Sequence, residues 1–159
     1  MGGMMVPIGL GLGRLGCLLV GCCFGGVCDR PWALSFPSHS PASAWQARAH
    51  LIDFASRPSL AVHPTQLYES FAALAIASFL ILYLHARKRY DGQVFAAFLA
   101  LYSLSRFVIE FWRSDDRGGW LWLSTSQWVG LVLLGAAAAI HWGRRRRPGQ
   151  AVPGFSPVA

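Results

Sequence analysis

The sequence predicts an all-α, polytopic membrane protein with about four transmembrane helices and one long loop that faces outward. Two observations support this prediction. The chain of 159 residues is 54% hydrophobic and only 13% charged, whereas a soluble domain usually carries about 25% charged residues. Its apolar residues also gather in blocks close to the roughly 20 residues that a helix needs to cross a bilayer. The composition therefore excludes a disordered chain and disfavours a water-soluble enzyme.

Each apolar block is expected to form one span. The first carries a single charge, Arg14, in its middle, whereas a secretory signal peptide has its positive charges before the apolar stretch. A proline-rich segment of about 40 residues follows, and Ser124 or Ser126 is expected to cap the last helix. Residues 1–147 are predicted to form one membrane domain, with spans at about 4–24, 66–85, 94–112 and 125–142, an outer loop at 25–64 and a disordered tail at 148–159.

Positive charge sets the expected orientation. The net charge is +7, and basic residues follow the second and fourth apolar blocks, at Arg87, Lys88 and Arg89 and at 144–147. Short cytoplasmic loops are enriched in lysine and arginine. We therefore expect a multi-pass protein of a bacterial cytoplasmic membrane, with its C-terminus in the cytoplasm. Nucleic acid is not an expected partner, because no basic stripe is interleaved with aromatic residues.

The ionisable residues inside the apolar blocks are the strongest functional signal. Arg14, Arg106 and Glu110 each cost about 2.5–3.5 kcal/mol inside a membrane. Arg106 and Glu110 lie four residues apart and can pair on one helix face. Arg113, three residues after Glu110, is expected on the same face. These residues form either a buried salt bridge between helices or a polar pocket for an anionic group. The excess of arginine favours a phosphate pocket, since guanidinium binds phosphate through two parallel hydrogen bonds.

A second polar cluster lies where the outer loop enters the second span. It comprises His63, Gln66, Tyr68 and Glu69, with Pro64 expected in the first helical turn and Glu69 near the positive end of the helix dipole. Two interpretations remain open. The residues either begin a helix and do nothing more, or they form a polar boundary suited to headgroup chemistry.

The four cysteines also admit several interpretations. Cys17, Cys22, Cys23 and Cys28 do not have the spacing of a paired zinc ribbon, so no metal is expected. Small thiols that fill a tight helix are favoured. A disulfide between Cys28 and either Cys22 or Cys23, and a reactive thiol, are the alternatives.

Four segments, taken in order, resemble one known family. They are Gly13-Arg14-Leu15-Gly16-Cys17…Gly25, Pro31-Trp32-Ala33…Phe36-Pro37, His63-Pro64-Thr65-Gln66-Leu67-Tyr68-Glu69, and Arg106-Phe107-Val108-Ile109-Glu110-Phe111-Trp112-Arg113. Together they resemble the prolipoprotein diacylglyceryl transferase family over about residues 6 to 142. The family has Asn at the position of Cys17 and Glu at the position of Cys22. In the family, about three further helices with a His-containing motif precede the arginine motif.

This resemblance implies a reaction and a set of roles. A diacylglyceryl group would pass from phosphatidylglycerol to the lipobox cysteine thiol of a secreted prolipoprotein, without a cofactor. Arg106 would lie beside the reacting headgroup, Glu110 would orient it, and His63 is the available candidate for a base. The implied substrate-binding residues are Arg14, Gly16, Gln66, Tyr68, Glu69 and Arg113. The implied partners are phosphatidylglycerol, the prolipoprotein signal peptide and membrane lipids.

Two other hypotheses follow from the sequence. The cysteines in place of the family's Asn and Glu fit a non-catalytic membrane module that binds phospholipid or assists assembly. The four thiols fit, less well, a thiol redox protein of the membrane.

Overall fold

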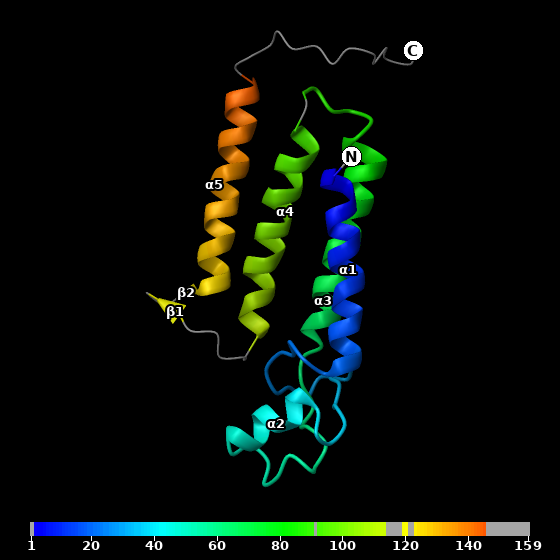
Figure 1. The fold of residues 1–159 in the computed structure, drawn as a ribbon, viewed down its shortest axis with the longest axis vertical. Coiled ribbons are helices and arrows are strands. Elements are labelled where there is room, and N and C mark those ends of the chain that lie inside the picture. The colour runs from blue at the N-terminus through cyan, green and yellow to red at the C-terminus, as the bar shows by residue number, and fades with distance from the viewer. Residues whose placement is uncertain (1, 91, 114–118, 121–122, 146–159) are drawn as a thin grey trace.

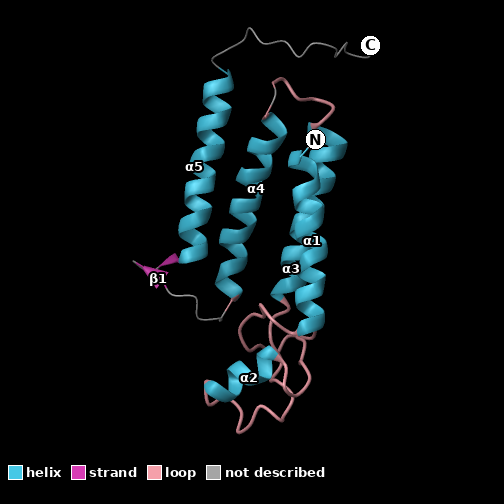
Figure 2. Cartoon of the chain, in the orientation of Figure 1, coloured by secondary structure: helices cyan, strands magenta, loops and turns pink. Residues whose placement is uncertain are grey.

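Four long helices form an antiparallel bundle in the computed structural model, and a smaller cap lies at one end (Figure 1). The structure describes residues 2–90, 92–113, 119–120 and 123–145. Helices dominate this part of the chain, and its only strands form one short ladder (Figure 2). The mainly helical fold expected from the apolar blocks is therefore confirmed.

The first long helix, α1, spans Gly2–Val20 and ends in a Schellman cap. Gly21 adopts a φ of 75°, the left-handed conformation that glycine accepts without a steric penalty. The Gly21 amide donates to Leu18 O at 3.2 Å, and the Cys22 amide donates to Cys17 O at 3.1 Å. The helix thus ends four residues before the predicted end of the first span, and Cys22 and Cys23 lie in the turn that follows.

The cap comprises residues 21–64 and contains a short helix, α2, at Pro41–Arg48. Ser40 caps this helix by accepting a hydrogen bond from the Ser43 amide at 3.2 Å, a preferred role for serine at a helix start. The cap has a core of its own, built from Phe24, Phe36, Ala42 and Val62. The segment predicted as an outer loop therefore folds into a small unit with its own helix and core.

Helices α3 and α4 lie at the centre of the bundle. α3 spans Thr65–Phe79 and continues as a wide π-helical turn over Leu80–Leu84. Pro64 immediately precedes α3, one position before the first helical turn in which it was expected. α4 spans Gln93–Ile109 and tightens into a 3-10 turn over Glu110–Trp112.

The last part of the bundle is α5, at Thr125–Arg145. Two-residue strands precede it, β1 at Gly119–Trp120 and β2 at Leu123–Ser124, and pair antiparallel. Ser124 caps α5, since its hydroxyl accepts from the Gln127 amide at 3.2 Å while Gln127 Oε1 accepts from the Ser124 amide at 2.9 Å. This reciprocal pair is a capping box, and it identifies Ser124 rather than Ser126 as the cap.

Two helical segments are long and apolar enough to cross a membrane by length and composition, Thr65–Leu84 and Gln93–Trp112. α1 contains a shorter apolar helix, Met5–Val20. Large apolar side chains project from the bundle, including Leu19, which is 88% exposed, and Leu82, which is 79% exposed. A soluble monomer rarely leaves such side chains in contiguous exposed patches, so these surfaces are consistent with a lipid environment.

Close backbone contacts fix the cap and α1 against the other helices. A Cβ added to Gly11 would lie 2.9 Å from Leu74 Cγ, so α1 approaches α3 closely there. A Cβ at Gly25 would lie 2.5 Å from Trp112 O and 2.7 Å from His63 Cβ. Gly25 is thus held between the segment before α3 and the segment after α4, and brings the cap-side ends of the bundle together.

The basic turn between α3 and α4 lies at the end of the bundle opposite the cap, and α5 ends near the same level (Figure 1). Arg87, Lys88 and Arg89 belong to this turn. The predicted disordered tail at 148–159 lies outside the described residues.

Candidate functional site

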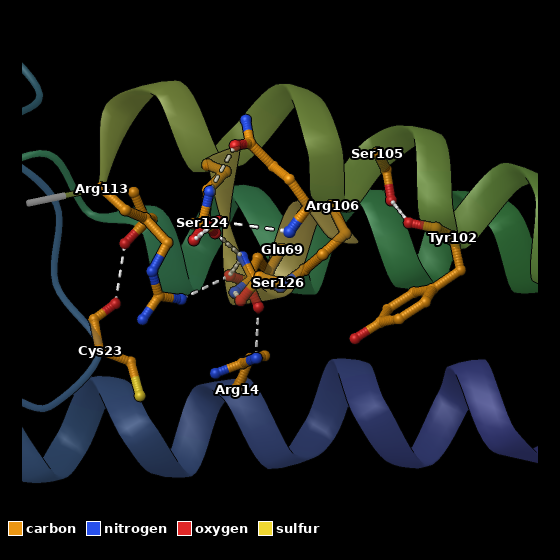
Figure 3. A network of polar contacts seen from close by, with 12 residues as sticks. Arg14, Cys23, Glu69, Tyr102, Ser105, Arg106, Arg113, Ser124 and Ser126 are labelled. Atoms are coloured by element: carbon orange, nitrogen blue, oxygen red, sulfur yellow. Dashed lines mark hydrogen bonds and ion pairs between the residues drawn. The ribbon is translucent and has the colours of Figure 1, made fainter. Parts of the chain in front are cut away.

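A buried carboxylate, Glu69, is the centre of a polar cluster at the cap-side end of the bundle (Figure 3). Glu69 lies on the second turn of α3, and its side chain is 7% exposed. Its Oε2 lies 2.5 Å from Arg14 Nε of α1. Its Oε1 accepts from Arg106 Nη1 of α4 at 3.0 Å and from Arg113 Nη1 at 2.8 Å. Three arginines, one from α1 and two from α4 and the turn that follows it, therefore share one carboxylate.

Glu110 forms a second acidic position in the cluster. Its Oε2 lies 2.9 Å from Arg106 Nη1, four residues earlier, so the pairing predicted from the spacing is present. That oxygen has no aligned hydrogen-bond donor within the described structure. The other oxygen, Oε1, accepts from the Ser124 hydroxyl at 2.7 Å.

The start of α5 completes the cluster. Arg106 Nη2 donates to the Ser126 hydroxyl at 3.1 Å, while Ser124 binds Glu110 and caps α5. The two serines were expected only as alternative helix caps. Their contacts with Arg106 and Glu110 of the α4 region could not be predicted from the sequence, because these contacts depend on how α4 and α5 pack.

Positive charge exceeds negative charge in this cluster. Among the residues that the structure describes, Arg14, Arg106 and Arg113 contribute three positive charges, and Glu69 and Glu110 contribute two negative charges, which leaves these five side chains with a net charge of +1. The Arg113 side chain is only 2% exposed. Buried charge is costly unless it is balanced, so the cluster is suited to one further anion.

Two cavities adjoin the cluster. One, of about 240 Å³, lies between α4 and α5 against Arg106 and Ser126. The other is an apolar groove of about 690 Å³ between α3 and α4, which extends from Tyr68 along both helices. The cavity therefore has an arginine in its wall, whereas the groove shares no lining residue with it and can take an apolar chain. The other residues that line the groove include Phe71, Ala75, Leu104 and Val108.

The predicted base, His63, belongs to a separate contact. Its Nδ1 lies 3.2 Å from the Tyr68 hydroxyl, which also accepts from Trp32 Nε1 at 2.8 Å. No contact of His63 among the described residues reaches the arginines. Tyr68 lies beside Glu69 in the chain but presents its side chain to the groove, so His63 and Tyr68 lie at the edge of the site.

Two other residues predicted to bind substrate, Gln66 and Gly16, have no contact with the arginines among the described residues. Gln66 is buried and donates from Nε2 to Cys22 O at 2.7 Å, while its Oε1 lacks a partner within the described residues. Gly16 is exposed, and nothing lies within 4 Å of the position a Cβ would take. The structure thus brings Arg14, Glu69, Arg106, Glu110 and Arg113 together, whereas Gly16 lies apart and its predicted role remains a prediction.

The turn after α1 carries thiols beside the arginines. Burial would raise the pKa of Cys23, but hydrogen bonds with Cys22 and Arg113 and the charges of Arg113 and Arg14 outweigh it, so the pKa is lowered. Burial, and to a smaller extent the neighbouring thiols of Cys23 and Cys17, raise the pKa of Cys22 to about 11. Cys17, Cys22, Cys23 and Cys28 are all half-buried and none is in a disulfide, so the disulfide considered from the sequence is not formed in this structure.

The sequence analysis placed Glu69 in a polar cluster where the outer loop enters the second span, separate from the arginines, whereas the structure places it at the centre of the arginine cluster. Its position in the first turns of a helix was correctly identified. The sequence could not show that Arg14 and Arg113 converge on Glu69, because neither arginine lies on the same helix as Glu69.

Comparison with known proteins agrees with the predicted resemblance. The family model for prolipoprotein diacylglyceryl transferase matches residues 1–142. The phosphatidylglycerol–prolipoprotein diacylglyceryl transferase of Burkholderia ambifaria is 42% identical over 160 residues, which covers 91% of this chain and 54% of that protein. A second such enzyme from Clostridium perfringens is 34% identical over 124 residues, covering 78% of this chain and 43% of that protein.

The chain therefore spans about half the length of the curated relatives it matches. The family match covers α1, the cap, α3, α4 and most of α5, and so includes every residue of the Glu69 cluster. On this match, the chain belongs to the prolipoprotein diacylglyceryl transferase family.

Proposed function

We propose that this chain binds the anionic headgroup of phosphatidylglycerol and takes part in moving its diacylglyceryl group to the lipobox cysteine of a prolipoprotein. The observation that carries the proposal is the convergence of Arg14, Arg106 and Arg113 on a single buried carboxylate. The family membership supports it, since relatives are named as phosphatidylglycerol–prolipoprotein diacylglyceryl transferases.

Charge supports this choice of ligand. Phosphatidylglycerol carries one phosphodiester and so one negative charge, which matches the net charge of +1 in the cluster. Arginine binds phosphate through paired, charge-assisted hydrogen bonds. The phosphate would lie in the cavity beside Arg106, and the acyl chains would lie along the apolar groove between α3 and α4.

The proposed transfer follows from this placement. The acceptor thiolate attacks the carbon of the diacylglyceryl unit that bears the phosphate. A carbon–sulfur bond forms, the bond between that carbon and the phosphate oxygen breaks, and the headgroup glycerol leaves as glycerol phosphate. Arg106 would stabilise the charge that grows on the leaving phosphate, and Glu110 and Ser126 would hold its guanidinium in place. The thiol proton would pass to His63 at the edge of the site.

The proposed setting is a bacterial cytoplasmic membrane crossed by α1, α3, α4 and α5. The cap would face the periplasm or the cell exterior, where the signal peptide of a secreted precursor is accessible. The basic turn between α3 and α4 lies at the opposite end, where the positive-inside rule favours the cytoplasm. The predicted cytoplasmic C-terminus agrees with this orientation.

Binding of phosphatidylglycerol by arginine variants tests the first part of the proposal. Arg14→Ala and Arg106→Ala should each weaken binding about 10- to 100-fold, because a hydrogen bond to a charged group contributes roughly 1.5–3 kcal/mol. Native mass spectrometry with phosphatidylglycerol and phosphatidylcholine would measure it. Arg57→Ala is the matched control, because Arg57 is exposed on the cap.

Arg14→Lys serves as a variant that keeps the charge while removing the planar donor group, and should lie between Arg14→Ala and the parent. Unchanged binding in both alanine variants, with circular dichroism equal to the parent, would refute the headgroup site.

A strain depleted of its own transferase tests the chemistry. Restored lipoprotein modification supports the transfer, and loss of that rescue in Arg106→Ala assigns it to this site. The second candidate is a non-catalytic phospholipid-binding module, which the cysteines at positions 17 and 22 favour. That function would be identified by binding of phosphatidylglycerol without rescue, in cells where the protein is inserted. A thiol redox role predicts instead a reversible disulfide that forms in the membrane.

A further inference from the structure

Three thiols converge at the end of α1, beside the arginine cluster. The sulfur atoms of Cys17, Cys22 and Cys23 all lie within 4.8 Å of one another. Within the described ranges, this is the only group of three histidine, cysteine or acidic side chains with ligand atoms so close. Cys28 is also half-buried but does not belong to the group.

The helix cap explains why the thiols meet. The Schellman turn directs the Cys22 amide back to Cys17 O, which places the residue after the helix over the last helical turn. Cys23 then adopts a φ of 61°, a conformation that costs a residue with a side chain roughly 1–2 kcal/mol.

The start of α3 holds this turn in place. Thr65 donates from its hydroxyl to Cys23 O at 2.8 Å, and Gln66 donates from Nε2 to Cys22 O at 2.7 Å. Both anchoring side chains are buried, at 0% and 1% exposure. The three sulfur atoms are therefore presented by a backbone that is fixed before any ligand arrives.

The surroundings favour negative charge on the sulfur atom of Cys23. Arg113 forms a hydrogen bond with the Cys23 side chain, and Arg14 lies close enough to act on it electrostatically. Figure 3 shows Cys23 beside both arginines. Guanidinium groups at this position offset the charge of a thiolate cluster, which a purely apolar helix end would not do.

We propose that Cys17, Cys22 and Cys23 bind one thiophilic metal cation, Zn²⁺ or Cu⁺, through three thiolates. Thiolates select these soft cations over Mg²⁺ or Ca²⁺. A zinc–sulfur bond of about 2.3 Å places tetrahedral thiolates about 3.8 Å apart, so the three sulfur atoms need to move by only about 1 Å. A disulfide would use two sulfur atoms and leave the third unexplained.

Three protein ligands leave one coordination position of a tetrahedral Zn²⁺ open, as in zinc sites that bind a water molecule or a substrate. Cu⁺ would be satisfied by the three thiolates. The two cations therefore share one ligand set but differ in the fourth position, which the experiment below distinguishes. The proposal does not depend on the proposed transferase reaction.

Metal titration of the full chain tests the proposal. The reduced protein in detergent should bind one equivalent of Zn²⁺ or Cu⁺ in competition with a chromophoric chelator. Cys17→Ser, Cys22→Ser and Cys23→Ser should each weaken binding at least about 10-fold, whereas Cys28→Ser is the matched control and should bind like the parent. Titration with Co²⁺ adds a spectroscopic measure, because thiolate-to-cobalt charge-transfer absorption reports sulfur ligation.

Three outcomes would overturn the proposal. They are binding weaker than that of the chelator for both metals, equal loss in Cys28→Ser, and a disulfide among the three thiols in unreduced protein that binds no metal after reduction. Tighter binding of Zn²⁺ with an exchangeable water identifies the open site, and tighter binding of Cu⁺ identifies the three-coordinate one. Arg106→Ala should keep the metal, which separates this test from the test of headgroup binding.

Discussion

Glu69 places one negative charge among three guanidinium groups. Replacing it should therefore lower the stability of the fold more than breaking any one ion pair on the surface. Removing one partner of a buried ionic network commonly costs about 3–5 kcal/mol, because the remaining charges stay buried without compensation. Arg14, Arg106 and Arg113 would repel one another once the carboxylate is gone. The stability of the bundle therefore depends on this one residue.

We predict that Glu69→Gln lowers the free energy of unfolding by about 3–5 kcal/mol, since glutamine keeps the volume but not the charge. Unfolding in mixed detergent micelles, followed by circular dichroism, would measure the loss. Asp53→Asn is the control, because Asp53 pairs with Arg57 on the exposed surface of the cap and its loss should have little effect. Equal stability of Glu69→Gln and the parent would contradict the role given to this carboxylate.

At the scale of elements, α5 contributes to the site through its first turn. Ser124 both caps α5 and donates to Glu110, while Ser126 accepts from Arg106. The start of α5 and the arginine cluster therefore share residues. A substitution at the N-cap residue of α5 should change the lipid binding of the site.

Ser124→Ala should lower stability by about 1 kcal/mol, the usual cost of losing a serine cap, and should also weaken phosphatidylglycerol binding because Glu110 loses its hydroxyl donor. Thermal unfolding and lipid titration on the same preparation would test both effects. Ser126→Ala is the comparison, since it removes the Arg106 contact but keeps the cap. A Ser124→Ala protein with normal stability would show that the Gln127 side chain alone suffices.

The elements also show what sequence reasoning can reach. Arg106 and Glu110 were paired correctly, because a four-residue spacing on a helix fixes a shared face. The convergence of Arg14 and Arg113 on Glu69 required knowledge of how α1, α3 and α4 pack. The cysteine spacing did not indicate the metal site proposed above, for a related reason. The thiols approach one another across a helix cap with two left-handed residues, Gly21 and Cys23, and Cys23 has no sequence signal comparable to that of glycine.

At the scale of the whole molecule, the cap and the basic turn occupy opposite ends of the bundle. We predict that trypsin added to intact spheroplasts cleaves after Arg48, an exposed residue at the end of α2. Cleavage at Lys88 and Arg89 should require prior opening of the membrane. Mass spectrometry of the fragments would distinguish the two positions, and the reverse pattern would place the cap in the cytoplasm.

The location of Glu69 has a consequence for biogenesis. Its partners are divided between α1, which is synthesised earlier, and the α4 region, which is synthesised later. In the proposed membrane setting, each unpaired charge costs about 2.5–3.5 kcal/mol in the hydrocarbon, so α1 and α3 would gain by leaving the insertion machinery as a pair, joined through Arg14 and Glu69. Arg106 and Arg113 would then reach a carboxylate that is already in place, which would give co-translational assembly a preferred order.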